Sequence, residues 1–289
     1  MISYAPGDLI PGPDVIMTRR LGAGGQGEVI LAWNEALKSR VVLKLLNPEL
    51  VGHDAERMFQ KEARLMTQLR HRNIVRVVHA GWTREEIRRP YYIMDEEPGA
   101  IPLSELIASR TPFAVSNVLS IGIQVCDALH KAHTLTGPNK ELLGAIHRDL
   151  KPANLLIMKD DDGNTIVKLL DFGIAWALYL VVHGLVARAF HGTVAYASPE
   201  QHIGRAVPQS DLYSLCVVLY ELLAERHPFW DAEDVNDMMA LHRFKKARPL
   251  TEYVVGLPAS VVALIAKNLD KDPTKRSRSA AELKADLIL

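Results

Sequence analysis

The character of the sequence changes at Pro98-Gly99, and this change constrains the fold more than any other feature. Between Asp14 and Ile93, short β-type runs alternate with glycines and one helical stretch, whereas most of the chain after Gly99 has helical spacing. The length of 289 residues agrees with this division, since a domain takes about 150 residues. We therefore predict an irregular leader over 1–13, a β-rich lobe over 14–97 and a mainly helical lobe over 98–289.

The composition excludes several classes of protein. Lys+Arg and Asp+Glu each number 34, so the formal charge of zero argues against a nucleic-acid partner held by phosphate attraction. Cys126 and Cys216 both lie in apolar stretches and are interpreted as buried thiols, which leaves no disulfide framework. The first residues lack the basic region followed by an apolar region that is typical of a signal peptide. No run approaches the roughly 18 to 20 apolar residues that a membrane-spanning helix needs. We expect a cytoplasmic location and no membrane contact within this chain.

Hydrophobic spacing predicts the elements of both lobes. In the first lobe we expect a hairpin from 15–17 and 29–32, further strands over 41–46, 74–78 and 91–94, and a helix that the polar run 68–73 closes. In the second lobe we expect helices over 118–133, 211–224, 261–269 and 279–287 and a hairpin from 154–157 and 167–170. Its acidic turn, Asp160 to Asn164, lacks the glycine position and the twelfth-position Glu of a calcium-binding EF-hand loop. We interpret 134–144 as a surface insertion.

A glycine run joins the two strands of the predicted first hairpin. Its pattern, Gly22-x-Gly24-x-x-Gly27, lets backbone N–H groups approach an anion such as a phosphate. In dinucleotide-binding folds the third glycine begins a helix, but Glu28 to Ala32 is β-like here. A hairpin over a nucleotide fits this pattern better, and a simple hairpin turn is the alternative.

A lysine and a glutamate lie on predicted apolar faces of the first lobe. Lys44 shares its strand face with Val42 and Leu46, and Glu62 shares the helix face marked by Phe59 and Met66. Because an unpaired buried charge is costly, a Lys44–Glu62 pair satisfies both side chains. The alternative is two long side chains that reach separately to solvent.

The run His147-Arg148-Asp149-Leu150-Lys151-Pro152-Ala153-Asn154 is followed, 22 residues after Asp149, by Asp171-Phe172-Gly173. With these motifs the sequence resembles the bacterial Hanks-type (eukaryotic-like) serine/threonine protein kinase domain over about residues 14–287. Further matches are the glycine run, Val41 to Lys44, Gly192-Thr193, Ser198-Pro199-Glu200, Asp211 and Arg276. The resemblance implies an α+β, bilobal protein-kinase-like fold, with a small antiparallel β-sheet lobe that carries one regulatory helix and a larger mainly α-helical lobe.

The resemblance also implies ATP and Mg²⁺ as cofactors, with Mn²⁺ as the alternative ion, and it assigns roles to residues. Asp149 accepts the proton of the incoming hydroxyl, and Lys151 neutralises charge on the transferred phosphoryl group. Asn154 and Asp171 hold the metal ions. Lys44, held by Glu62, positions the α- and β-phosphates. Thr193 forms hydrogen bonds with Asp149 and Lys151.

The same resemblance implies a nucleotide site between the lobes. The phosphate-binding loop is Gly22, Ala23, Gly24, Gly25, Gln26 and Gly27. Val29, Val42 and Leu156 sandwich the adenine ring, Met94 lies at the back of the pocket, and the hinge runs from Asp95 to Glu97. Val42 replaces the alanine that is usual in the family, so its two extra methyl groups narrow the adenine slot. The acidic side chains of the hinge can equally be a solvated connector.

The activation-loop position, 174–191, departs from the family pattern. Of its 18 residues 14 are apolar, it holds no Ser or Thr, and Tyr179 carries its only hydroxyl. By the resemblance, Arg148 provides a cationic receptor for a phosphate on this loop. We hypothesise that 178–186 packs as a short helix against the cleft or the helix of Glu62, or docks a protein regulator or a second copy of the chain. The alternative is a locally buried loop without regulatory meaning.

The expected activity is ATP-dependent transfer of the γ-phosphoryl group to Ser or Thr hydroxyls of a protein substrate. A nucleotide-binding pseudokinase or autoinhibited scaffold is the alternative, and the intact catalytic residue types count against it. A small-molecule phosphotransferase is less favoured, because Lys151, Thr193 and Ser198-Pro199-Glu200 indicate a polypeptide acceptor. Glu200 and Arg276 are expected to form a buried ion pair, and the chain can be the cytosolic kinase domain of a longer protein.

Overall fold

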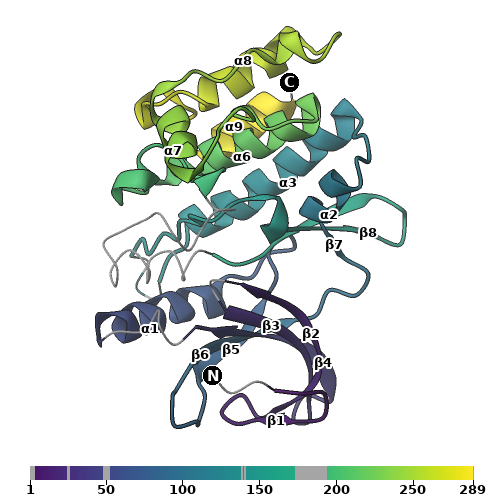
Figure 1. Cartoon of the computed structure of the whole chain (residues 1–289), viewed down its shortest axis with the longest axis vertical. Coiled ribbons are helices and arrows are strands. Elements are labelled where there is room, and N and C mark those ends of the chain that lie inside the picture. The colour runs from purple at the N-terminus through teal and green to yellow at the C-terminus, as the bar shows by residue number, and fades with distance from the viewer. Residues whose placement is uncertain are drawn as a thin grey trace. The chain divides into compact units, whose positions relative to one another are not determined.

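The structure is a computed structural model that describes residues 4–24, 27–47, 53–137, 139, 141–172 and 194–288, without the side chains of 53–58, 61 and 62. The described chain forms two compact units. One holds residues up to His71 together with Val75–Pro98, and the other holds Arg72–Ile74 and the chain from Gly99 onward. Each unit is shown in Figure 1, the first in purple and blue and the second from teal to yellow.

The first unit is a curled antiparallel sheet with one helix (Figure 1). Its strands lie in the order β1-β2-β3-β4-β6-β5. Their bounds are β1 (Leu9–Ile10), β2 (Val15–Gly24), β3 (Gly27–Asn34), β4 (Ser39–Leu46), β5 (Val77–Trp82) and β6 (Pro90–Asp95), and the helix is α1 (His53–Gln68). The hairpin of β2 and β3, the strand β4 and the helix α1 confirm the predicted elements.

The alternation of side chains gives this sheet two different faces. Ile30, Leu43 and Ile93 are register partners on neighbouring strands, and all three belong to the buried cluster that fills the inside of the curl. On the opposite face, Phe59 of α1 packs on Tyr92 of β6 at 5.0 Å and on Trp82 of β5 at 5.4 Å between ring centroids. The helix therefore covers the sheet face that carries Tyr92.

Two predictions for this part of the chain are wrong. The leader is not wholly irregular, because Leu9–Ile10 pairs with β2 and the Ile10 side chain is fully buried in the curl. The strand predicted over 74–78 begins only at Val77 and continues to Trp82. Ile74 instead forms an isolated parallel bridge with Leu169 of the second unit. An apolar run can serve two sheets in succession, and its spacing alone does not mark the change.

The second unit is mainly helical and carries a small sheet in the order β7-β8-β9 (Figure 1). Its helices are α2 (Leu103–Ala108), α3 (Val115–His133), α6 (Pro208–Ala224), α7 (Val235–Phe244), α8 (Ala259–Asn268) and α9 (Ala280–Ile288). Its strands are β7 (Ile101–Pro102), β8 (Leu155–Lys159) and β9 (Thr165–Leu169), and short 3₁₀ turns lie at 152–154, 201–203, 250–252 and 273–275. The four predicted helices and the predicted hairpin are confirmed, whereas α2, α7 and β7 were not anticipated.

Helix α6 forms the core of this unit, as its almost continuous apolar sequence predicts. From Ser210 to Ala224 every side chain except Glu221 is buried. Helix α3 packs closely on it at Gly122, where an added Cβ would lie 3.1 Å from side-chain atoms of Leu219 in α6 and of Leu287 in α9. These packed helices give the loops before β8 and α6 a rigid support.

Several smaller predictions are also resolved. Asp160 closes the turn between β8 and β9 by accepting hydrogen bonds from the backbone of Asp162 and Asn164, so a hairpin turn is confirmed there. Cys126 and Cys216 are free buried thiols, and burial raises the pKa of Cys216 to about 12. In the described part of 134–144, Leu142 is largely exposed and bridges Thr136, whereas Leu135 is buried.

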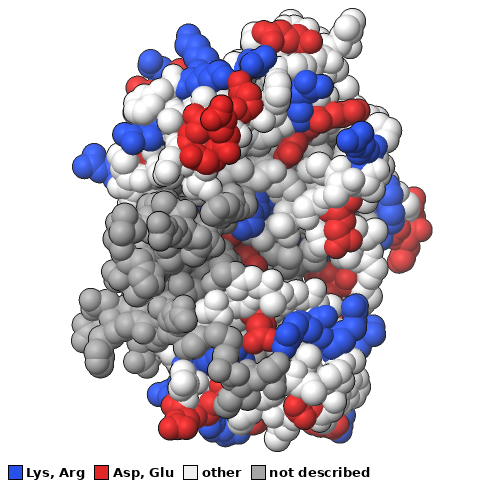
Figure 2. Space-filling view, in the orientation of Figure 1, with Lys and Arg blue, Asp and Glu red and all other residues white. Residues whose placement is uncertain are grey.

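The described surface has no face of a single charge sign in the view of Figure 2. Basic and acidic side chains are interspersed over each unit there, in keeping with the formal charge of zero. Among the residues that the structure describes, no helix combines the length and the apolar character needed to cross a membrane.

Candidate functional site

The loop before β8 gathers three predicted site residues around one carboxylate. Asp149 is buried, and Lys151 Nζ donates to both of its carboxylate oxygens at 2.9 Å. Asn154 Nδ2 donates to the Asp149 carboxylate at 3.1 Å and to the Asp149 carbonyl at 2.7 Å. The 3₁₀ turn that begins at Pro152 brings Asn154 back toward Asp149. The second unit therefore brings Asp149, Lys151 and Asn154, three of the predicted site residues, into contact with one another.

A buried carboxylate from helix α6 holds this loop from behind. Asp211 accepts hydrogen bonds from the backbone N–H groups of His147 at 2.8 Å and Arg148 at 2.9 Å, and from His133 Nε2 at 2.7 Å. Burial alone would raise the pKa of Asp211, but these hydrogen bonds and the nearby histidines lower it below its usual value. The support lets Arg148 adopt its left-handed backbone, with φ of 64°. The sequence reasoning missed His133, which ends helix α3.

His147 connects the loop to the segment that carries Asp171. Its Nε2 donates to the Leu170 carbonyl at 2.7 Å, its Nδ1 accepts from the Asp149 N–H at 3.2 Å, and its ring lies 4.7 Å from that of Phe172. Burial lowers the pKa of His147, so the neutral ring supplies one donor and one acceptor. The Leu170 N–H also donates to the Asn154 carbonyl at 2.9 Å. Asp171 thus follows directly from a residue bonded twice to the loop of Asp149.

The segment after residue 194 is tied to the same loop. Gln201 Nε2 donates to the Arg148 carbonyl at 2.7 Å, and Gln201 Oε1 accepts from the N–H and hydroxyl of Ser198, both at 3.0 Å. Gln201 was not among the predicted site residues, because nothing in its spacing relates it to Arg148. The segment 198–201 therefore packs directly against the backbone of the residue before Asp149.

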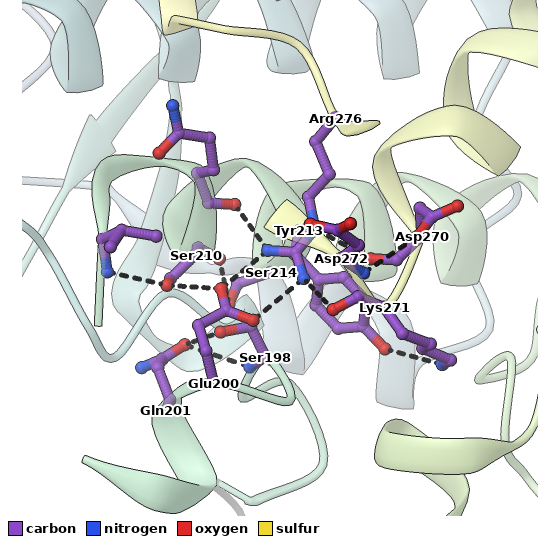
Figure 3. Close-up of polar contacts among 12 residues, drawn as sticks. Ser198, Glu200, Gln201, Ser210, Tyr213, Ser214, Asp270, Lys271, Asp272 and Arg276 are labelled. Atoms are coloured by element: carbon purple, nitrogen blue, oxygen red, sulfur yellow. Dashed lines mark hydrogen bonds and ion pairs between the residues drawn. The ribbon is translucent and has the colours of Figure 1, made fainter. Parts of the chain in front are cut away.

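The predicted ion pair of Glu200 and Arg276 is confirmed (Figure 3). The guanidinium donates to both carboxylate oxygens, at 2.7 and 2.9 Å, and its side chain is fully buried. Ser210 donates to Glu200 at 2.6 Å, and the Tyr213 ring lies 4.8 Å from the guanidinium. Burial opposes ionisation of Glu200, but the bonds from Arg276 and Ser210 lower its pKa. This pair anchors the segment 198–201 to the helical core.

In the first unit, four predicted site residues share one face of the sheet. Val29 and Lys44 are register partners on β3 and β4, and Val42 and Met94 are partners on β4 and β6. Because Val42 and Lys44 are two residues apart on one strand, both pairs point to the same side. Lys44 is buried there, opposite Tyr92 in register. This is the face that α1 covers through Phe59, and Glu62 follows Phe59 by one turn of that helix.

The glycines of the first hairpin differ in what they permit. Gly27 has φ of 140°, and a Cβ there would lie 1.9 Å from the Leu45 carbonyl oxygen, so packing against β4 requires glycine. Among the residues that the structure describes, a Cβ added at Gly22 or Gly24 would meet no atom within 4 Å. Packing within the described part of the chain therefore does not explain the glycines at 22 and 24.

Other predicted positions are resolved only in part. Ala23 pairs with Glu28 in the hairpin, and Asp95 ends β6. Glu97 follows Glu96, which forms an ion pair with Arg40 at 2.9 Å. Leu156 lies on β8 of the second unit, opposite Lys168. Gly25, Gln26, Gly173, Thr193, the segment 174–191 and the side chain of Glu62 lie outside the described residues.

The comparisons with known proteins agree with this geometry. The family described as protein kinase domain matches residues 16–287. The chain is 36% identical to the serine/threonine-protein kinase Pkn1 of Myxococcus xanthus, over 92% of this chain and 36% of that protein. It is 34% identical to serine/threonine-protein kinase A of Synechocystis, over 90% of this chain and 50% of that protein. The chain thus spans about a third to a half of the length of these relatives.

The solved structures show the same fold at lower sequence identity. The kinase domain of PknI from Mycobacterium tuberculosis matches with a TM-score of 0.75 at 24% identity and covers 99% of each chain. That likeness supports the expected α+β architecture with its curled β-sheet lobe and helical lobe. Given the family match over residues 16–287 and the cluster around Asp149, the chain belongs to the protein kinase domain family.

Proposed function

We propose that this chain is an active serine/threonine protein kinase domain, which transfers the γ-phosphoryl group of ATP to Ser or Thr hydroxyls of a protein. The observation that carries the proposal is the buried Asp149 carboxylate, held by Lys151 and Asn154 within 3.1 Å. Phosphoryl transfer depends on positioning and charge neutralisation more than on covalent catalysis, and this cluster can do both.

On the acceptor side, Asp149 would orient the incoming hydroxyl and accept its proton. The carboxylate is fixed by donors on two sides, so it needs little reorganisation during the reaction. Lys151 Nζ, which lies 2.9 Å from both carboxylate oxygens, would shift toward the transferred phosphoryl group and neutralise its charge.

The metal-binding role falls to Asn154 and Asp171. Asn154 donates two hydrogen bonds through Nδ2, and these bonds fix the orientation of its amide group. Its Oδ1 takes part in neither of these two bonds. An amide oxygen and a carboxylate are hard donors that suit Mg²⁺, or Mn²⁺ in its place. When bound, the ion would neutralise charge on the ATP phosphates.

The first unit supplies the groups proposed for ATP itself. Lys44 would hold the α- and β-phosphates, and the open backbone at Gly22 and Gly24 would approach the phosphate chain. Val29, Val42 and Met94, which share the sheet face of Lys44, would contact the adenine together with Leu156. A pairing of Lys44 with Glu62 and a hinge at 95–97 belong to the same proposal.

A protein acceptor is favoured over a small molecule. The segment 198–201 is fixed both to the loop of Asp149 through Gln201 and to the helical core through Glu200 and Arg276. A fixed surface beside the proposed base suits an extended polypeptide. We propose that this domain is located in the cytosol, because its proposed substrate ATP is present there.

The experiment that tests the activity is a transfer assay with radiolabelled ATP, Mg²⁺ and a generic protein substrate. Asp149→Asn removes the proposed base, and we expect a loss of at least about a hundredfold in kcat. Asp162→Asn is the matched control, because Asp162 is an exposed carboxylate in the β8–β9 turn. If the wild-type chain transfers the phosphoryl group and the Asp149→Asn variant transfers it equally well, the proposed role of Asp149 is refuted. A wild-type chain that binds ATP without transfer would favour the pseudokinase.

We also propose that control of this domain does not depend on phosphorylation within 174–191. The proposal rests on the composition of that segment, in which 14 of 18 residues are apolar and none is Ser or Thr. Packing of the segment, or its docking to a regulator or a second copy, would then set the activity. Mass spectrometry of the autophosphorylated protein tests this. A dominant phosphosite at Tyr179 whose removal abolishes activity would contradict the proposal.

A further inference from the structure

One backbone carbonyl in the segment before Ser198 accepts hydrogen bonds from two histidines. His227 Nε2 lies 2.6 Å and His242 Nε2 lies 2.7 Å from the carbonyl oxygen of Ala195. His227 lies in the loop after α6, and His242 belongs to α7. Two elements that are distant from residue 195 in the sequence therefore hold the same atom.

Each of these histidines is oriented by its second ring nitrogen. His227 Nδ1 accepts from the backbone N–H of Phe229 at 3.1 Å. His242 Nδ1 lies 2.9 Å from the hydroxyl of Tyr213, which can donate to it. Because Nδ1 accepts in both rings, both histidines carry their proton on Nε2 and direct it at the Ala195 carbonyl. His242 is fully buried and His227 is partly buried, so these bonds form largely away from water.

The residues around this carbonyl are fixed as well. Tyr196 donates to Glu221 of α6 at 2.7 Å, and its ring meets that of His227 edge-on at 5.5 Å between centroids. Tyr213, which orients His242, also packs on Arg276 of the ion pair in Figure 3. The backbone at Ala195 is thus fastened to α6 and α7, while Gln201 fastens the following residues to the loop of Asp149.

The clamped residue Ala195 belongs to the same segment as Gln201, which bonds the residue before the proposed catalytic base. We expect a polypeptide whose hydroxyl reaches Asp149 to run along the segment 194–201, because Gln201 of that segment bonds the carbonyl of Arg148, the residue before Asp149. Two donors on one carbonyl are more than its burial requires, since one bond satisfies a backbone acceptor. The second donor adds rigidity, and a rigid surface binds an extended chain at a lower entropic cost.

We propose that His227 and His242 are positioning residues for the protein acceptor, which act by fixing the carbonyl of Ala195. The inference rests on the proposed kinase function and goes beyond it, because neither histidine touches the reacting groups. It predicts that loss of the clamp weakens binding of the acceptor and leaves the handling of ATP unchanged.

The test compares two substitutions of similar side-chain length, one with and one without an N–H hydrogen-bond donor. His227→Met and His242→Met remove the N–H group, whereas His227→Gln and His242→Gln retain an amide donor near the position of Nε2. In steady-state kinetics we expect each Met variant to raise the KM for the protein substrate about fivefold, the factor that one neutral hydrogen bond is worth. The KM for ATP should stay within twofold, and each Gln variant should recover most of the loss.

The control is His130→Met, which replaces an exposed histidine of α3. An unchanged KM for the protein substrate in folded Met variants would overturn the inference, as would equal losses in the Met and Gln variants. If His242→Met does not fold, the partly buried His227 decides the outcome through the same comparison. A wild-type chain that transfers no phosphoryl group would instead refute the proposed function, so the two failures are distinguishable.

Discussion

Single residues in this protein show how a buried charge depends on its partner. Arg276 and Glu200 form two hydrogen bonds at 2.7 and 2.9 Å, and the arginine side chain is fully buried. Arg276→Ala leaves the Glu200 carboxylate buried without its cation, so we expect a loss of about 3–5 kcal/mol in the free energy of unfolding. Urea denaturation of the purified domain measures this loss.

The double variant Glu200→Ala/Arg276→Ala distinguishes the pair from simple packing. With both charges removed, no buried charge is left unpaired, so the double variant should lose less than the sum of the two single variants. Additive losses would show that the ion pair contributes little beyond the volume of its side chains. Lys267→Ala, which removes a more exposed ion pair with Glu282, should cost at most about 1 kcal/mol.

Whether a site residue could be predicted depended on how far its partners lie along the chain. Asp149, Lys151 and Asn154 lie within six residues, so the resemblance identified them together and the structure brings them together. His133 and Gln201 were missed because their partners, Asp211 and the Arg148 carbonyl, lie 78 and 53 residues away. Neither side chain has a spacing that signals such a contact. The clamping histidines at 227 and 242 escaped notice for the same reason.

At the scale of elements, the β2–β3 hairpin separates glycines needed for folding from glycines open to a ligand. Gly27→Ala would force a Cβ to within 1.9 Å of the Leu45 carbonyl oxygen and would strain a φ of 140°. We expect a loss of at least about 2 kcal/mol in the free energy of unfolding. Gly22→Ala meets no atom of the described residues within 4 Å, so the stability of the domain should change little.

Gly22→Ala should also change the binding of ATP. If the backbone at Gly22 approaches phosphate oxygens, Gly22→Ala should raise the KM for ATP severalfold while the melting temperature stays within a few degrees. Equilibrium unfolding and steady-state kinetics on the same preparations measure both effects. An unchanged KM for ATP in Gly22→Ala would show that this glycine has no part in nucleotide binding.

Elements with a strong internal pattern were predictable, and elements defined by their neighbours were not. Helix α6 is apolar on all sides and was predicted within a few residues, because only a buried helix tolerates that composition. Strand β1 has only two residues and is defined by its pairing with β2. Ile74 was predicted to begin a strand, but it forms a bridge with Leu169 instead. Helix α7, capped by Asp234, has a mixed face that does not distinguish it from a loop.

At the scale of the whole molecule, buried histidines should make the fold sensitive to acid. Burial lowers the pKa of His202 and of His227 to about 4, and burial together with the neighbouring histidines lowers that of His242 well below its usual value of 6.5. The folded state therefore binds fewer protons than the unfolded state once the pH falls below about 6.5. The stabilisation is complete above that pH and is lost as the pH falls toward the folded-state pKa values.

The carboxylates that are hydrogen-bonded in the fold extend this loss to lower pH. Glu200 and Asp211 have lowered pKa values, since burial is outweighed by the bonds from Arg276 and His133, so their contribution is complete only above their ordinary pKa values of 4.5 and 3.8. Between pH 6.5 and 5, each of the three histidines should cost up to about 1.4 kcal/mol per pH unit. Unfolding by urea at a series of pH values measures the slope.

Substitution assigns that slope to particular rings. In His227→Gln/His242→Gln, two groups that the unfolded chain would protonate are gone, while His202 and His147, whose pKa values burial also lowers, remain. The dependence of the unfolding free energy on pH between 6.5 and 5 should therefore fall by about half. His130→Gln, which replaces an exposed histidine of α3, is the control and should leave the dependence unchanged. A free energy of unfolding that stays constant from pH 7 to 5 would mean that the buried rings become protonated without cost, which their burial beside Arg243 and Lys271 opposes.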